Sequence, residues 1–286
     1  MADIEKAQDR LDVLRKEQEY ERQGIFDVDL EQDPPRTRTI RPGEVDYKKK
    51  KLINRIKAKI ALAMGHKAVR KLKKQGLFEV TDILGVENIR NLKSGAVITC
   101  NHFNPFDSFA VQLAYEKAHP KGRKFFRIIK ESNYTDFPGM YGFLMRNCNT
   151  LPLSESKAVM LECLRATDDL LEAGHLVLVY PEQAMWWNYR KPRPLKQGAF
   201  RFAVNAGVPV IPMFIEQQDT DRIGPDGFVV QKYTIHICEP IYPDNDKTLK
   251  ENCQILADEN YRVWKEIYEK AYNTKLEYLT EQSPKN

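Results

Sequence analysis

The sequence has no long uncharged apolar run, and no window approaches the roughly 18 to 20 apolar residues that a membrane-spanning helix needs. Its most apolar run, 208–215, has only the length of a strand. Residues 1–18 are rich in Asp, Glu, Lys and Arg, so we expect no secretory signal peptide. We therefore expect a chain that does not cross a membrane.

Cysteine is also scarce: the five residues, at 100, 148, 163, 238 and 253, are odd in number, widely scattered and never arranged as CxxC. This pattern argues against a zinc knuckle or a disulfide framework and favours a reducing cytoplasm. The hydrophobic content of 42% and the charged content of 30% are typical of a soluble globular protein. The 286 residues are enough to bury one large core or two modest ones.

Positive charge is concentrated in one block. Between residues 48 and 74 there are twelve Lys or Arg and no acidic residue, although the whole chain carries a net charge of only +5. Ile53, Ile56, Ile60 and Met64 follow helical spacing in this block. The pattern predicts a basic amphipathic helix over 47–76 that lies on an anionic membrane surface. The basic residues expected to contact the membrane are Lys48, Lys49, Lys50, Lys51, Arg55, Lys57, Lys59, Arg70, Lys71, Lys73 and Lys74.

The same helix can instead pack its apolar stripe on the rest of the protein. Composition alone does not choose between anionic lipid and nucleic acid as the partner of a basic block. However, no nucleic-acid recognition motif or aromatic stacking platform accompanies it, so we expect no nucleic-acid partner.

The pattern along the chain predicts an α/β fold. Residues 1–46 form a polar N-terminal extension and linker, expected to lie outside the core. Strand-like runs then alternate with helical patterns over 77–245, which predicts a mostly parallel or mixed central sheet flanked by helices. A final helical stretch, 246–286, is expected to pack on this domain. The predicted strands are 96–100, 124–129, 175–180, 208–215 and 228–238, and the predicted helices between them are 107–118, 137–147, 155–173 and 197–206.

The segment NHFNPFD, 101–107, directly follows a predicted buried strand. It places His102 at the strand end and Asp107 where the next helix begins, in good N-cap position. An imidazole held in one tautomer by a carboxylate can remove a proton from an alcohol near neutral pH. Taken alone, the spacing also fits an Asn-Pro turn in which both side chains satisfy backbone groups. The interpretation therefore depends on the rest of the chain.

A second segment, YPEQAMW at 180–186, also follows an apolar strand and places Glu182 at the carboxyl ends of the strands, where open α/β sheets bind ligands. A proline-rich basic loop follows it, which is either a phosphate cradle or a solvated loop. A metal site made of His102, Asp107 and Glu182 lacks the nitrogen and sulfur ligands typical of zinc, and we expect no metal. The cations of the loop are Arg190, Lys191, Arg193 and Lys196.

Four blocks in order resemble the glycerolipid acyltransferases, the family typified by bacterial 1-acylglycerol-3-phosphate acyltransferase. NHFNPFD matches the family's NH-x4-D, residues 142–154 lie where the family has its second block, and YPEQAMW is similar to the FPEGTRS type. VPVIP, 208–212, matches the fourth block, and GVENI, 85–89, looks like the family's approach to the first strand. The resemblance covers roughly residues 77–242.

The resemblance implies that His102 is the general base, that Asp107 orients it and that Glu182 binds or orients the acceptor. It implies transfer of a fatty acyl group from acyl-CoA or acyl carrier protein to the hydroxyl of lysophosphatidic acid, giving phosphatidic acid. No cofactor is expected beyond the thioester substrate. The enzyme is then expected to be cytoplasmic, peripheral at the cytoplasmic face of the membrane.

The sequence departs from the family where the acceptor phosphate is recognised. Ser154 stands where the second block usually ends in arginine, and residues 183–185 are Gln, Ala and Met instead of Gly, Thr and Arg. Arg146 and the cations of the 190–196 loop are candidates to supply the missing charge. The departures leave open another lysolipid or a glycolipid as the acceptor. A non-catalytic, peripheral membrane-binding protein that retains the fold is a further alternative.

Overall fold

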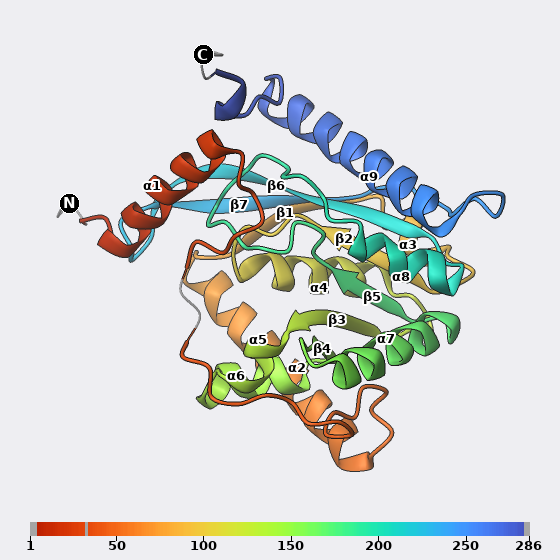
Figure 1. The fold of residues 1–286 in the computed structure, drawn as a ribbon. Helices are drawn as coiled ribbons and strands as arrows, with labels where there is room; N and C mark the ends of the chain where they lie inside the picture. Colours follow the sequence, from red (N-terminus) through yellow and green to blue (C-terminus); the bar gives the residue numbers. More distant parts are fainter. Residues whose placement is uncertain (1–4, 32–33, 283–286) are drawn as a thin grey trace.

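The computed structural model describes residues 5–31 and 34–282, and its centre is a mixed sheet with helices on both faces (Figure 1). In this part of the chain seven strands pair in the order β1-β7-β6-β2-β5-β3-β4. The five from β6 to β4 in that order run parallel, whereas β7 is antiparallel to β6. The expected mixed α/β sheet is thus confirmed. The strands are β1 Glu79–Leu84, β2 Ala96–Cys100, β3 Phe125–Lys130, β4 Thr150–Leu153, β5 Leu176–Val179, β6 Val210–Ile223 and β7 Val229–Ile237.

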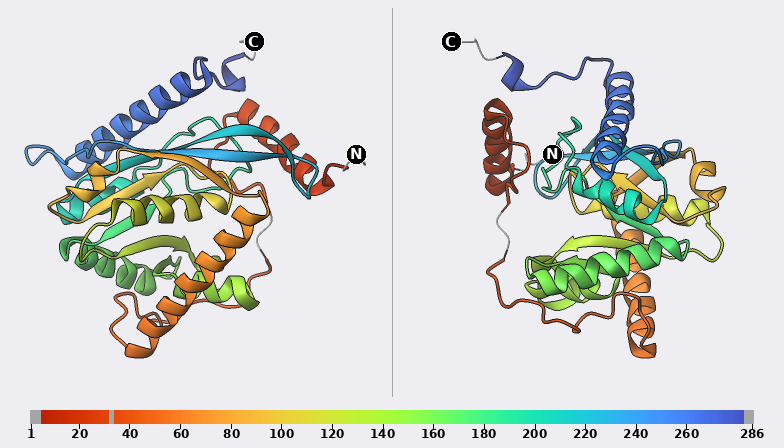
Figure 2. Two further views of the ribbon diagram at one scale, coloured as in Figure 1. Left: turned by 180° about the vertical axis from the view of Figure 1, so that it is seen from behind. Right: turned by 45° about the vertical axis from the view of Figure 1, so that its right-hand side comes forward.

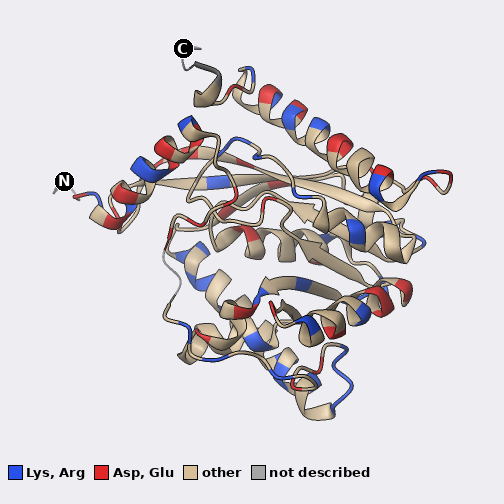
Figure 3. Ribbon diagram, in the orientation of Figure 1, with Lys and Arg blue, Asp and Glu red and all other residues tan. Residues whose placement is uncertain are grey.

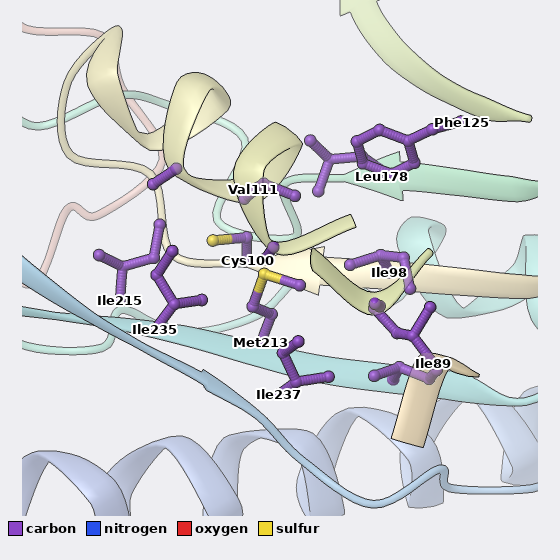
Figure 4. Packing of buried hydrophobic residues seen from close by; sticks show 14 of the residues in the cluster. Ile89, Ile98, Cys100, Val111, Phe125, Leu178, Met213, Ile215, Ile235 and Ile237 are labelled. Carbon is purple, nitrogen blue, oxygen red and sulfur yellow. The ribbon is translucent and has the colours of Figure 1, made fainter. Parts of the chain in front are cut away.

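Helices cover the two faces of the sheet because its central strands are apolar on both sides. In β2, Ile98 and Cys100 face one core cluster with Val111, as Figure 4 shows, whereas Val97 faces a second cluster with Phe200 and Leu256. The first cluster lies under α4 and α2, and the second lies under α7, α8 and α9. The helices are α1 Gln8–Gln23, α2 Leu52–Lys74, α3 Glu87–Arg90, α4 Phe106–Ala118, α5 Glu131–Thr135, α6 Gly139–Asn147, α7 Lys157–Glu172, α8 Gly198–Ala206 and α9 Leu249–Tyr272, with a 3-10 turn η1 at Leu279–Gln282.

Two strands that the sequence analysis does not predict, β1 and β4, lie at the edges of the sheet. In addition, β6 continues beyond the apolar run that predicted it. Its second half, 216–223, is polar up to residue 222, alternates half-buried and exposed residues from 218 onward, and pairs with β7 in a long hairpin. Edge positions need only one apolar face, so they lack the continuous apolar pattern by which buried strands are recognised.

The N-terminal extension packs against the domain, whereas the sequence predicts that it lies outside the core. Val13 of α1 and Leu30 are buried against Trp186. The segment after α1 then runs along the carboxyl edge of the sheet (Figure 1), where Ile40 is buried and its amide donates to Glu131 at 2.6 Å. Residues 1–4 and 32–33 of the predicted extension, and 283–286 of the predicted C-terminal segment, lie outside the described residues.

Helix α2 lies obliquely against the domain (Figure 2, left) and buries small residues, Ala58 and Ala61, instead of its isoleucines. Ile53, Ile56 and Ile60 are exposed, so the stripe that could have packed on the core faces solvent. Lys and Arg flank this stripe, and no Asp or Glu lies on the helix (Figure 3). No described helix is long and apolar enough to cross a membrane.

Two of the predicted membrane-contacting cations attach to the domain instead. The side chain of Lys49 is buried, and desolvation lowers its pKa. Lys48 forms an ion pair with Asp169 of α7. The loop before α2 therefore uses these two lysines to attach to the domain, while Lys50, Lys51 and the cations of α2 remain exposed.

Candidate active site

The predicted base and its partner are in direct contact. His102 follows β2, and its Nδ1 lies 2.7 Å from Oδ2 of Asp107. Asp107 is fully buried, whereas the His102 side chain is 22% exposed. An ionised carboxylate can only accept hydrogen bonds, so Nδ1 carries the proton and Nε2 is left as the basic nitrogen. The sequence analysis expected Asp107 to cap a helix, but α4 begins at Phe106 and the carboxylate instead turns back to the preceding loop.

The loop between His102 and α4 is shaped by this carboxylate. Asp107 Oδ2 accepts the amide of Phe103 at 3.1 Å, and the Asn104 side chain accepts the amide of Phe106 at 2.8 Å. Such short-range bonds from Asp and Asn side chains to nearby amides are typical of turns. The local sequence thus contributes to the distance between the histidine and the aspartate through bonds within the loop itself.

A tyrosine completes the group. Tyr180 follows β5, the neighbour of β2, and its hydroxyl donates to Oδ1 of Asp107 at 2.7 Å. Its ring stacks on the imidazole of His102, with centroids 4.0 Å apart and planes 18° apart. Burial, and then the nearby Asp107 charge, raise the pKa of Tyr180 well above its usual value. The hydroxyl therefore stays protonated at neutral pH and acts as a donor.

Glu182 is buried and contacts the backbone of His102, whereas the sequence analysis expects it in a ligand-binding crevice. It is 2% exposed and forms an ion pair with Arg193, which is 1% exposed, at 2.9 Å. The same carboxylate oxygen accepts the backbone amide of His102 at 2.9 Å, and the other accepts the amide of Arg193 at 2.8 Å. Arg193 also donates to the carbonyl oxygen of His102 at 3.2 Å. This buried pair therefore holds the backbone of the histidine and is already satisfied by protein groups.

Comparisons with known proteins concern the segment that carries these residues. Residues 81–216, which include both sequence blocks of the site, match the model of the Acyltransferase family. This chain has an acyltransferase-family domain. It is 26% identical over 151 residues to a chloroplastic 1-acyl-sn-glycerol-3-phosphate acyltransferase of Brassica napus, covering 52% of this chain but only 40% of that relative's length. The crystal structure of the 1-acyl-sn-glycerophosphate acyltransferase from Thermotoga maritima aligns with a TM-score of 0.49 and 22% identity, covering 73% of this chain and 79% of the other.

In this acyltransferase-family domain, the loop after Glu182 is covered by the N-terminal extension. Ala184 and Trp186, which stand where the family pattern FPEGTRS has Thr and Ser, are buried against α1 and Leu30. The Trp186 ring nitrogen donates to the carbonyl oxygen of Val28 at 2.9 Å, and the Met185 amide donates to Asp29 at 3.2 Å. Ala184, Met185 and Trp186 therefore contact a segment outside the matched residues, whereas Gln183 is exposed.

The cations predicted to bind phosphate all have partners within the protein. Arg146 donates to the backbone carbonyl oxygens of Tyr134 and Phe137, each at 3.2 Å, and Arg193 is buried as described. Ser154 is also buried. The three remaining cations form ion pairs: Arg190 with Asp219 at 2.5 Å, Lys191 with Glu21 at 2.5 Å, and Lys196 with Asp27 at 2.6 Å.

Two residues at the carboxyl ends of the strands were not assigned from sequence. Tyr180 is the first residue of the YPEQAMW segment. The feature that could have identified it is its hydroxyl, since the family pattern has Phe at this position. Lys130, at the end of β3, forms an ion pair with Asp29 of the extension. Its position next to β5 could have been inferred only with the sheet order known. Within the described residues, no group of three or more His, Cys, Asp or Glu is arranged to hold a metal ion.

Proposed function

We propose that this chain transfers a fatty acyl group from an acyl thioester to the hydroxyl of a lysolipid, with lysophosphatidate as the first candidate acceptor and phosphatidate as its product. The observation that carries the proposal is the 2.7 Å contact between His102 and a fully buried Asp107. It leaves Nε2 of the partly exposed imidazole as a base at the carboxyl end of the sheet, where α/β folds bind ligands. The match to the acyltransferase family supports the same chemistry.

In the proposed reaction, His102 Nε2 takes the proton from the acceptor hydroxyl as its oxygen attacks the thioester carbonyl carbon. The tetrahedral intermediate then collapses, the carbon–sulfur bond breaks, and the imidazolium returns the proton to the leaving thiolate. Asp107 keeps Nδ1 protonated and stabilises the imidazolium throughout. No covalent bond to the protein is formed, and the donor is acyl-CoA or acyl carrier protein.

The test is thiol release by purified protein with acyl-CoA or acyl carrier protein and a panel of acceptors at equal concentration. We expect turnover that depends on lysophosphatidate and falls by roughly a hundredfold or more in His102→Ala, with an unchanged circular-dichroism spectrum. An active His102→Ala variant would show that the base is assigned wrongly. A protein that binds vesicles but turns over no donor would be a membrane-binding protein that retains the fold.

A second acceptor class is favoured by a specific observation: each of the predicted phosphate-binding cations already has an internal partner. A lysophospholipid with another head group, or a glycolipid, would not need an unpaired phosphate cradle. The acceptor panel distinguishes these readings, because a preference for such acceptors over lysophosphatidate would assign the enzyme to this second class.

We further propose that α2 holds the protein at the cytoplasmic surface of an anionic membrane. Its exposed isoleucines are flanked by cations, and Met140 and Tyr141 of the contacting helix α6 are exposed as well. An interfacial helix of this kind binds through apolar insertion and through attraction to anionic lipids. Binding to anionic vesicles should weaken with salt and in Ile56→Glu, but not in Ile255→Glu, which changes an exposed isoleucine of α9. Salt-insensitive binding would contradict this proposal.

A further inference from the structure

Tyr180 makes two contacts with the catalytic pair that the acyl-transfer mechanism does not by itself require. Asp107 uses one oxygen for His102 and the other for Tyr180, each at 2.7 Å. The phenol ring of the same tyrosine lies against the face of the imidazole. The carboxylate is thus shared between a histidine and a tyrosine, both held close to it.

We propose that Tyr180 is a positioning residue for the base: its hydroxyl limits how strongly Asp107 stabilises protonated His102, and its ring holds the imidazole plane. This inference rests on the proposed function, which makes His102 the base. The family pattern FPEGTRS has a phenylalanine here, which supplies the ring without the hydroxyl.

The direction of the effect follows from the hydrogen bonds of the carboxylate. A donor to an ionised carboxylate stabilises its negative charge, so less of that charge acts on the neighbouring imidazolium. Asp107 is fully buried, so water does not replace the donor when it is removed. Without the Tyr180 hydroxyl, Asp107 should hold the imidazolium more tightly, and His102 should become available as a base only at a higher pH.

Other charged and titratable groups surround the pair and stay in place when only the hydroxyl is removed. Glu182 and Arg193 contact the backbone of His102 from the motif loop. Cys100 and Tyr233 interact with the charge of Asp107 from β2 and β7, and Arg127 of β3 interacts with Tyr180. A change confined to the hydroxyl therefore reports its own contribution against a constant background.

The experiment is the pH profile of kcat/KM for Tyr180→Phe between about pH 5 and 9. We expect its acidic limb to move to higher pH by roughly half to one unit. Activity then falls about three- to tenfold near pH 6 and approaches the wild-type value at the alkaline end. The control is Tyr115→Phe, because Tyr115 lies on α4, the helix that carries Asp107. Its hydroxyl donates to the backbone carbonyl oxygen of Arg123 at 2.6 Å, and removing it should leave the pH profile unchanged.

A second variant should shift the acidic limb of the pH profile in the opposite direction. Difluorotyrosine at position 180 is a stronger donor, so it should move the acidic limb to lower pH. The NMR titration of the His102 ring, assigned with His102→Gln, should shift in the same two directions and needs no turnover. If both substitutions only scale activity at every pH, or if the titration midpoints coincide with that of the wild type, the proposal is overturned. Absence of wild-type turnover with every acceptor would instead refute the proposed function.

Discussion

Two loops leave the carboxyl ends of neighbouring strands, and they are held in different ways. The loop 101–107 carries its own bonds, since Asp107 contacts His102 and the Phe103 amide within a few residues, and Tyr180, Glu182 and Arg193 add further bonds to the same pair. The loop 183–187 is held from a distance, by α1 and the segment around Asp29. The first keeps the family pattern and the second has lost it. The loop that carries the proposed base thus keeps the family pattern, whereas the loop after Glu182 is covered by a segment outside the matched residues.

The difference also extends to charge. In the first loop the single charged partner of the base is fully buried, so its interaction is strong. Around the second loop, Lys196 pairs with Asp27 and Lys130 pairs with Asp29, and these side chains are about one third to one half exposed. Exposed ion pairs of this kind contribute little and exchange readily. His102 thus keeps its buried partner Asp107, whereas these two lysines can change partner.

The largest loss of activity should come from breaking the contact between His102 and Asp107. Asp107→Asn removes the charge that stabilises the imidazolium and the acceptor that fixes its tautomer. We expect kcat to fall by roughly 10³- to 10⁴-fold, measured as thiol release. The control is Asp168→Asn, the same change in α7, where one carboxylate oxygen is buried without a hydrogen-bond partner. Comparable losses in both variants would mean that folding, and not the base, is affected.

The next prediction distinguishes a structural role of Glu182 from a role in binding the acceptor. Glu182→Gln leaves the Arg193 guanidinium buried without a counter-charge, which costs about 3 to 5 kcal/mol of folding stability. Denaturant unfolding should show this loss. A variant with wild-type stability and a raised KM for the acceptor would contradict it, and would mean that Glu182 binds substrate directly.

The extension that covers the second loop should be sensitive to pH. Glu17 of α1 is buried with one oxygen lacking a partner, and burial raises its pKa to about 8, against the opposing effect of Arg193. The folded protein then retains a proton that the unfolded chain releases above its ordinary pKa of 4.5. Stability therefore falls as pH rises from 4.5 to about 8, by about 1.4 kcal/mol per unit, and is constant beyond that range.

Glu17→Gln removes this dependence. We expect the variant to exceed the wild type in stability by a margin that is absent near pH 4.5 and reaches about 3 kcal/mol at pH 7. Urea unfolding at several pH values measures it, with Glu19→Gln, an exposed position of the same helix, as the control. A margin that is the same at every pH would show that Glu17 is ionised in the folded state.

Sequence reasoning predicted the contact between His102 and Asp107 because the signal for it is local. The strand 96–100 is apolar except for Thr99, and the spacing of His102 and Asp107 places both after this strand end. The central strands and the long helices were predicted for the same reason: each carries its own periodicity. Edge strands β1 and β4 have weaker patterns, and they were missed.

What could not be predicted depends on contacts between distant segments. Nothing near Lys196 in the sequence indicates that Asp27 will pair with it, and nothing in 183–187 indicates that Leu30 will cover Trp186. The loop cations were therefore assigned to phosphate, although Lys191 and Lys196 pair with Glu21 and Asp27 of the extension. The orientation of α2 is similar: its isoleucine spacing fits both packing and exposure, and only the burial of Ala58 and Ala61 shows which face is turned inward.

The smallest effect tests whether the extension competes with the acceptor. Asp27→Asn combined with Asp29→Asn would release Lys196 and Lys130 while keeping side-chain size. Each pair is partly exposed and contributes at most about 1 kcal/mol, so we expect KM for lysophosphatidate to fall about two- to fivefold with kcat unchanged. An uncharged monoacylglycerol acceptor should show no change, and neither should Glu31→Gln, which removes a pair with Arg10 within the extension. If KM for lysophosphatidate is unaffected, these lysines do not reach the acceptor, and the rebuilt loop selects a molecule without that phosphate.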